Sequence, residues 1–197
     1  MALPPLKLAL ASEADLQTSL STLFEPSPEL KQKLVPQLVA HLHDPSNHPS
    51  TYSDLIDISL EKLSFWSDAE RASFIASHPR IGEVSGLSSL SAKEQATVAT
   101  PSEVLARLGH LNSLYEERYP GLRYVIFVDG RSRAEIIPLI EQKLGIALLE
   151  GDKLDYPSIE SIIPLLMTDE EWKVELDRAV ADVGKIAKSR LQKLGIE

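Results

Sequence analysis

The chain has 197 residues, of which 43% are hydrophobic and 25% are charged, a composition typical of folded globular proteins. Its 20 Lys and Arg against 29 Asp and Glu give a net charge of −9. No basic cluster stands out, which argues against binding to nucleic acid or to anionic membranes. The chain has no cysteine, which excludes disulfides, iron–sulfur clusters and thiolate zinc sites.

The length fits one domain spanning residues 1–197. No apolar run approaches the roughly 20 residues of a membrane helix. The first residues, MALPPLKLALAS, lack a basic start and contain two prolines, so they are not expected to act as a signal peptide. A cytoplasmic protein is the simplest expectation, with a peroxisomal location left open.

Helix start signals recur along the chain and predict an all-α, multi-helix bundle. Residues 27–43 read as a helix that Pro36 kinks or splits. Ser53 is expected to precede a helix over 54–66. Paired residues with capping-box spacing predict four further helix starts, at Ser67 and Glu70, Ser91 and Glu94, Thr100 and Glu103, and Thr168 and Glu171.

The second half contains one strand-like run, RYVIFVDG, at residues 123–130. Because a lone strand has no partner, we expect a buried extended or irregularly helical segment inside an all-α domain. Residues 145–171 are expected to connect helices and to carry a short helix. The last helix should run from about Asp169 to Leu194, with an apolar stripe of Trp172, Leu176, Val180, Val183, Ala187 and Leu191.

Three of the five histidines, His41, His43 and His48, lie close together. His41 and His43 are two residues apart, so on a helix they point to different faces. No His-Glu-x-x-His pattern accompanies them. A solvated surface is therefore favoured over a metal site.

His78 has a different setting, because Pro79 pushes it out of the helical region and Gly82 releases the backbone shortly afterwards. A stiffly mounted imidazole could give and take protons near neutral pH. The alternative is a histidine that hydrogen-bonds the free carbonyls of a helix end. The spacing alone favours that alternative.

Four more polar residues have both structural and functional interpretations. Glu94 fits the predicted capping box, and Gln95 is unremarkable at a helix start. Asn112 lies on an apolar helix face, where its amide needs partners. Arg190 faces the stripe of the last helix, so it requires either a structural ion pair or a ligand carboxylate. No nucleophile elbow, phosphate-binding loop or dinucleotide fingerprint is present, which leaves a site without a cofactor.

Four segments in this order, SHPRIG, SAKEQATV, LNSLYEERYPGLRYVIFVDGRSRAEII and DVGKIAKSRLQKL, resemble the 2-oxo-4-hydroxy-4-carboxy-5-ureidoimidazoline (OHCU) decarboxylases. The resemblance covers roughly residues 70–142 and 172–194. It implies an all-α, cofactor-free lyase of purine catabolism that converts a ureidoimidazoline from urate degradation into (S)-allantoin and CO2. The family often forms homodimers, which leaves a homodimer open for this chain.

The same resemblance implies a site. His78, of the family's His-Pro motif, would handle the proton of the substrate's C4 hydroxyl, and Arg190 would orient the polar end of the substrate. Glu94 would act with them in catalysis. The expected substrate-binding residues are Pro79, Gln95, Asn112, Val125, Ile126 and Phe127, the last three through the backbone that lines the pocket.

Two departures from the family pattern keep alternatives open. The chain has YPGLRY where the family commonly has Phe-Gly-Phe-Pro-Phe, and this change brings Arg123 near the pocket wall. Residues 143–168 are also longer than expected. One alternative is a related decarboxylase or lyase acting on a different small heterocyclic acid. Another is a non-enzymatic helical module, in which His78, Glu94 and Arg190 would not converge on one pocket.

Overall fold

A computed structural model describes residues 3–83, 100–146 and 157–196 of the chain. Within these stretches every regular element is a helix, which confirms the all-α prediction. The first half contains α1 (Leu6–Ala9), α2 (Glu13–Phe24), a π-helical turn (Leu30–Leu34), α3 (Val35–His41), a 3-10 turn (Pro45–Asn47), α4 (Tyr52–Ser64) and α5 (Asp68–Ala76). The second half contains α7 (Ser102–Arg118), α8 (Arg133–Leu144), a 3-10 turn (Ile159–Ser161) and α9 (Glu170–Lys193).

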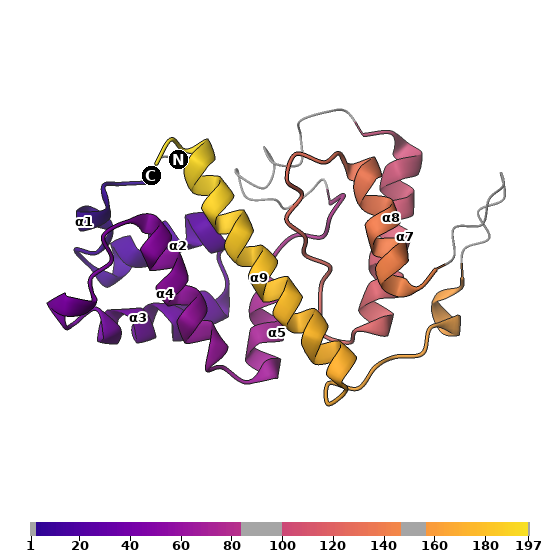
Figure 1. Cartoon of the computed structure of the whole chain (residues 1–197), viewed down its shortest axis with the longest axis horizontal. Helices are drawn as coiled ribbons and strands as arrows, with labels where there is room; N and C mark the ends of the chain where they lie inside the picture. The colour runs from indigo at the N-terminus through magenta and orange to yellow at the C-terminus, as the bar shows by residue number, and fades with distance from the viewer. Residues whose placement is uncertain (1–2, 84–99, 147–156, 197) are drawn as a thin grey trace.

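The long helix α9 crosses the middle of the molecule (Figure 1). It packs against α2, α4 and α5 on one side, while α7 and α8 pair with each other on the other side. Five of the six predicted stripe residues are buried and Val180 is partly buried. The helix ends at Gly195, whose φ of 67° is the left-handed conformation that glycine adopts at low cost. The predicted final helix is therefore confirmed.

The break at Pro36 is also confirmed. The N–H of Val35 donates to the carbonyl of Leu30, five residues back, so the chain makes a π-helical turn just before Pro36. Pro36 then lies in the first turn of α3, where its missing N–H breaks no hydrogen bond. The wider turn lets one helical segment pass into the next without a clash at the proline ring.

The helix caps correct several predicted starts. The Ser67 and Glu70 capping box is present at α5. However, α4 begins earlier than predicted, because Thr51 caps it together with Asp54, and Ser53 lies inside the helix. The predicted box at Ser91 and Glu94 lies outside the described residues.

Two predicted boxes are wrong because their side chains bind distant partners. Pro101 is the cap residue of α7, and the hydroxyl of Thr100 instead accepts from Arg133. Asp169, not Thr168, precedes α9, and the carboxylate of Glu171 binds other groups. Its partners are the guanidinium of Arg118 and the hydroxyl of Tyr119.

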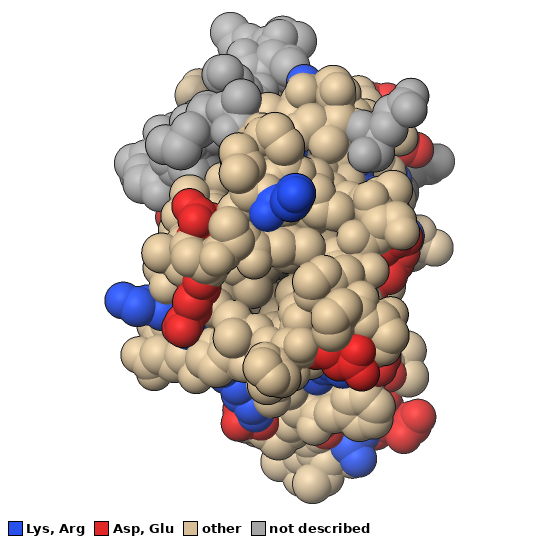
Figure 2. All heavy atoms as spheres, turned by 90° about the vertical axis from the view of Figure 1, so that its left-hand side faces the viewer, with Lys and Arg blue, Asp and Glu red and all other residues tan. Residues whose placement is uncertain are grey.

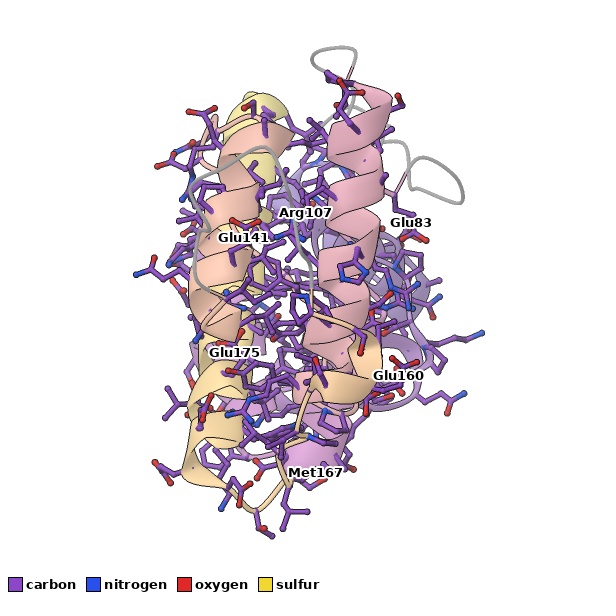
Figure 3. The ribbon with its side chains drawn as sticks, turned by 90° about the vertical axis from the view of Figure 1, so that its right-hand side faces the viewer. Glu83, Arg107, Glu141, Glu160, Met167 and Glu175 are labelled. Carbon is purple, nitrogen blue, oxygen red and sulfur yellow. The ribbon has the colours of Figure 1, made fainter. Side chains whose placement is uncertain are left out.

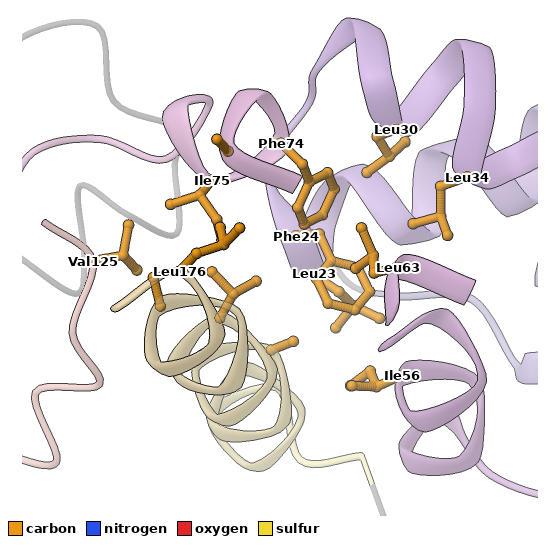
Figure 4. Packing of buried hydrophobic residues seen from close by; sticks show 14 of the residues in the cluster. Leu23, Phe24, Leu30, Leu34, Ile56, Leu63, Phe74, Ile75, Val125 and Leu176 are labelled. Atoms are coloured by element: carbon orange, nitrogen blue, oxygen red, sulfur yellow. The ribbon is translucent and has the colours of Figure 1, made fainter. Parts of the chain in front are cut away.

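The core lies where the N-terminal helices meet α9. Phe74 of α5 packs between Phe24 and Trp66, with ring centroids 6.0 Å apart in each pair. Figure 4 shows Phe24 and Phe74 on the side of the N-terminal helices that faces α9, with Leu176 on α9 and Val125 on the segment between α7 and α8. This cluster thus joins the first third of the chain to its last helix.

On the other side, Arg107 of α7 and Glu141 of α8 form a buried ion pair (Figure 3). The Nε–H of Arg107 donates to Glu141 at 2.9 Å. A buried pair of this kind fixes how two helices meet, whereas an apolar pair of similar volume is often at least as stable. The pair therefore fixes how α7 and α8 meet.

Two further features concern the surface charge and the lengths of the helices. Figure 2 shows the face made by the N-terminal helices, on which Lys, Arg, Asp and Glu are scattered among uncharged residues without forming a basic patch. In the three described stretches, no helix is both long and apolar enough to cross a membrane.

Candidate active site

His78 lies just past the end of α5, where the sequence places it. Helix α5 ends at Ala76, and the N–H of His78 donates to the carbonyl of Ile75. Pro79 follows at once, and Gly82 turns the chain with φ of 87°. Any side chain at that glycine would be strained and would press on Leu108, 3.1 Å away. The imidazole is therefore mounted on a short and stiff loop.

The ring of His78 is buried, with 3% of the residue exposed, and its edge packs on Phe74. Neither ring nitrogen makes a hydrogen bond of ordinary geometry to a described residue, but the carbonyls of Phe74 and Ile75 at the end of α5 lie near enough to raise the pKa of the ring against the effect of burial, as the structural alternative expects. Burial, and next the positive charge of Arg190, lower the pKa of His78 to about 4. At neutral pH it is an uncharged base with nitrogens available to a ligand.

This burial predicts a pH dependence of stability. A histidine whose pKa falls from 6.5 unfolded to about 4 folded binds its proton more readily in the unfolded chain. The contribution of the neutral His78 to the free energy of unfolding is therefore complete above pH 6.5 and is lost as the pH falls toward 4. The shift corresponds to roughly 3 kcal/mol. Urea unfolding at pH 7 and pH 4.5 should show a smaller loss in His78→Gln than in the wild type, and equal losses would contradict the buried, neutral histidine.

Arg190 faces inward, as its position on α9 predicts, with 2% of the residue exposed. Its Nη1 donates to the carbonyls of Thr22 and Leu23, at 3.3 and 3.0 Å. These carbonyls lie at the end of α2, where a helix lacks internal partners. Its Nη2 lies 2.5 Å from a carboxylate oxygen of Glu25.

Glu25 is the residue that the sequence analysis missed. It is buried at 4% exposure and has φ of 72°, a conformation that is strained for a residue with a side chain. This backbone conformation turns the chain at the end of α2 and brings the carboxylate of Glu25 to Arg190. Its signal was weak: a glutamate between a helix end and Pro26 resembles an ordinary exposed terminus.

The strand-like run forms no strand in the described structure, as expected. Residues 123–128 instead have no regular secondary structure. Figure 1 shows them as a stretched connection between α7 and α8, hereafter the extended segment. Tyr124 and Val125 are buried, and Ile126 and Phe127 are partly buried. Arg123 reaches back to the loop of His78 and donates to its carbonyl at 2.9 Å.

These parts enclose a cavity of about 200 Å³, smaller than the roughly 300–1,000 Å³ of sites for drug-sized ligands. It suits a small molecule. The lining residues come from the His78 loop, the start of α7, the extended segment, the start of α8 and the end of α9: His78, Pro79, Ile81, Thr100, Pro101, Val104, Tyr124, Val125, Ile126, Phe127, Val128, Arg131, Ser132, Arg133, Ala134, Ile186, Ser189, Arg190 and Lys193.

The polar lining has one sign of charge. Arg131, Arg133, Arg190 and Lys193 contribute to the wall, and none of the described lining residues is acidic. The capped N-terminus of α8 at Ser132 also faces the cavity and adds a partial positive charge. These basic side chains favour an anionic ligand, and the buried carboxylate of Glu25 offsets the charge of Arg190.

Six predicted site residues meet at this cavity: His78, Pro79, Val125, Ile126, Phe127 and Arg190. Asn112 does not line it. Its amide instead donates to the carbonyl of Ile81 at 3.0 Å, beneath the His78 loop. Glu94 and Gln95 lie outside the described residues. The non-enzymatic alternative required that His78, Glu94 and Arg190 do not converge on one pocket. Among the residues that the structure describes, His78 and Arg190 do converge on one.

Elsewhere the described part of the chain holds no group of three or more His, Cys, Asp and Glu residues that could bind a metal. His43 and His48 are exposed, and a ring nitrogen of His48 lies 2.8 Å from the carbonyl of Leu42.

A search of curated proteins found no match. In a comparison with protein-family models, the model described as OHCU decarboxylase matched residues 10–147. This range is well over half of the chain and includes His78, Glu25 and the extended segment, whereas Arg190 lies beyond it. The chain therefore belongs to the OHCU decarboxylase family and is a carboxy-lyase of urate and purine degradation that acts on a small molecule.

Proposed function

We propose that the protein converts 2-oxo-4-hydroxy-4-carboxy-5-ureidoimidazoline into (S)-allantoin and CO2, with His78 and Arg190 as its catalytic residues. One observation carries the proposal: an uncharged, buried imidazole and a buried guanidinium line the same small cavity. A neutral histidine is ready to accept a proton. A guanidinium matches a carboxylate in shape and charge.

The substrate supplies its own electron sink. The bond between C4 and the carboxylate breaks, CO2 leaves, and the electron pair moves toward the adjacent C=N, whose nitrogen takes a proton. The C4 hydroxyl then gives up its proton and C5 gains one, which yields the ring carbonyl at C4 and the new stereocentre of allantoin at C5. One proton is consumed for each CO2 released.

His78 would take the hydroxyl proton, since its ring nitrogens are unpartnered within the described structure and its pKa of about 4 keeps it neutral. Arg190 would hold the carboxylate end and offset the negative charge there. Delivery of a proton to one face of C5 by a fixed donor would set the (S) configuration. The protein's contribution is thus positioning and electrostatics.

The backbone of Ile126 would hold the ring and ureido amides of the substrate. The carbonyl of Val125 and the N–H of Phe127 are bound by side chains of α9. In an extended chain the amide groups of the residue between them point to the opposite side. Ile126 lines the cavity, and no backbone hydrogen bond of this residue is found within the described structure. We propose that Glu94 and Gln95 add to this binding, with Pro79 against the ring.

Nothing at Arg123 favours a different heterocyclic acid. Its guanidinium binds the carbonyl of His78 from behind the loop and does not line the cavity. Of the YPGLRY stretch, Tyr124 lines the cavity and Arg123 does not. The ureidoimidazoline therefore remains the proposed substrate, with Arg123 supporting the loop of His78.

The test is decay of freshly generated ureidoimidazoline with and without purified protein, followed together with CO2 release. We expect the protein to accelerate both. Other small heterocyclic acids should decay no faster with the protein than in buffer. Decay no faster than in buffer would refute the proposal, and faster turnover of another acid would favour the related lyase.

A further inference from the structure

Three charged side chains share one face of α9, on the N-terminal side of Arg190. Glu175, Arg178 and Asp182 follow one another at spacings of three and four residues, so they are stacked along the helix. Glu175 is fully buried and Asp182 is 7% exposed. Charged groups at such depth require partners, and two of these partners are backbone groups of the cavity wall.

Arg178 and Asp182 grip the extended segment directly. The Nη1 of Arg178 donates to the carbonyl of Val125 at 2.9 Å and to Asp182 at 3.0 Å. The same Asp182 oxygen accepts from the N–H of Phe127 at 3.3 Å. The guanidinium also lies over the ring of Tyr124, 5.3 Å from its centroid. Two side chains therefore bind the segment at alternate residues, as a neighbouring strand would.

Glu175 keeps the guanidinium of Arg178 in this orientation. It accepts from Nε and Nη2 of Arg178, at 3.0 and 2.7 Å. The hydroxyl of Tyr115 and the ammonium of Lys143 each lie 2.7 Å from the same carboxylate (Figure 3 labels Glu175). The arginine is thus anchored to α7 and α8 as well as to its own helix.

The side chains of α9 thus supply the hydrogen bonds that a neighbouring strand would supply in a sheet. Within the described structure, residues 124–127 make no backbone-to-backbone hydrogen bond, so main-chain pairing does not set their register. The side-chain bonds at Val125 and Phe127 do, and in an extended chain they leave the amide groups of Ile126 on the opposite side. A rotation of this short segment would move those groups out of reach of a bound ligand.

We propose that Arg178 and Asp182 are positioning residues for the decarboxylation: they fix the Val125–Phe127 backbone so that Ile126 presents its amide to the substrate. This inference rests on the proposed function. It adds two residues that touch no substrate and that act through the backbone they hold.

The test compares matched alanine variants on one helix. Asp182→Ala removes the acceptor of the Phe127 N–H. The control, Asp177→Ala, removes an ion pair with Arg71 that lies away from the segment. We expect kcat/KM for the ureidoimidazoline to fall about 10- to 100-fold in Asp182→Ala, mainly through KM because the amide contacts hold substrate and transition state alike. Asp177→Ala should match the wild type.

Two further readouts separate positioning from general stability. Hydrogen exchange at the Phe127 amide should accelerate in Asp182→Ala while amides of α7 stay protected. Asp182→Asn, which keeps an acceptor oxygen, should recover part of the lost KM. Arg178→Met should reproduce the Asp182→Ala defect if it folds, and Asp182→Ala carries the test if it does not.

The outcomes are distinct. If wild-type protein does not accelerate the reaction, the proposed function fails. If the wild type is active and Asp182→Ala equals Asp177→Ala in KM and in Phe127 exchange, the function stands and the positioning role is wrong. A raised KM with unchanged Phe127 exchange also overturns it, because the effect would then not pass through the segment.

Discussion

Replacing His78 with glutamine is expected to reduce the enzymatic rate about 100- to 10,000-fold, the usual contribution of a positioned acid–base group. Glutamine keeps a polar side chain of similar length but cannot take the hydroxyl proton. The fold should survive, because the neutral ring of His78 makes no side-chain hydrogen bond within the described structure. Decay of the ureidoimidazoline under saturating conditions measures the loss.

The control for this variant is His43→Gln, which changes an exposed histidine outside the cavity. It should leave the rate unchanged. Near-wild-type activity in His78→Gln would remove His78 from the mechanism. An unfolded His78→Gln, seen as lost helical circular dichroism, would instead show that the packing of the ring on Phe74 is its main role.

The second large effect is expected at the ion pair of Glu25 and Arg190. Glu25→Gln removes the negative charge 2.5 Å from the guanidinium and leaves a buried cation. Breaking one partner of a buried pair costs about 3–5 kcal/mol.

Arg190→Met should also destabilise the fold, and it should abolish decarboxylation because the substrate carboxylate loses its counter-charge. It should also raise the pKa of His78, which Arg190 lowers.

The double variant Glu25→Gln/Arg190→Met separates the two roles of this arginine. Because both charges are removed together, its loss in free energy of unfolding should be smaller than the sum of the single losses, yet it should stay inactive. Arg107→Met/Glu141→Gln is the matched control, a buried pair outside the cavity whose loss should leave turnover intact in the folded fraction. An active Glu25→Gln/Arg190→Met protein would reduce Arg190 to a structural role.

Patterns within one element predicted much of this structure. The apolar stripe of α9 follows from helical spacing and remains buried along its length. The π-helical turn before Pro36 follows from the missing N–H of proline. The absence of a sheet partner correctly predicted that 123–130 forms no strand; residues 123–128 have no regular secondary structure and residues 129–130 form a turn. In each case the cause lies within a few residues of its effect.

The misses arise where a side chain leaves its own element. Thr100 and Glu171 have the spacing of capping residues, but Arg133 and Arg118 compete for their oxygens. Glu25 meets Arg190 only because α2 ends beside α9, which no local pattern records. Asn112 was expected at the substrate and instead holds the loop of His78. The stacked charges of α9 were visible in the sequence, but their backbone partners depended on tertiary contacts.

The most direct test of the account is the configuration of the allantoin formed from one batch of ureidoimidazoline, divided among wild-type protein, His78→Gln and buffer. Circular dichroism reports the enantiomer and the rate together. We expect rapid formation of (S)-allantoin with the wild type, and slow formation without a net signal with His78→Gln and with buffer. Racemic allantoin at the buffer rate from the wild type, or an undiminished (S) signal from His78→Gln, would contradict a decarboxylation directed by His78 in this cavity.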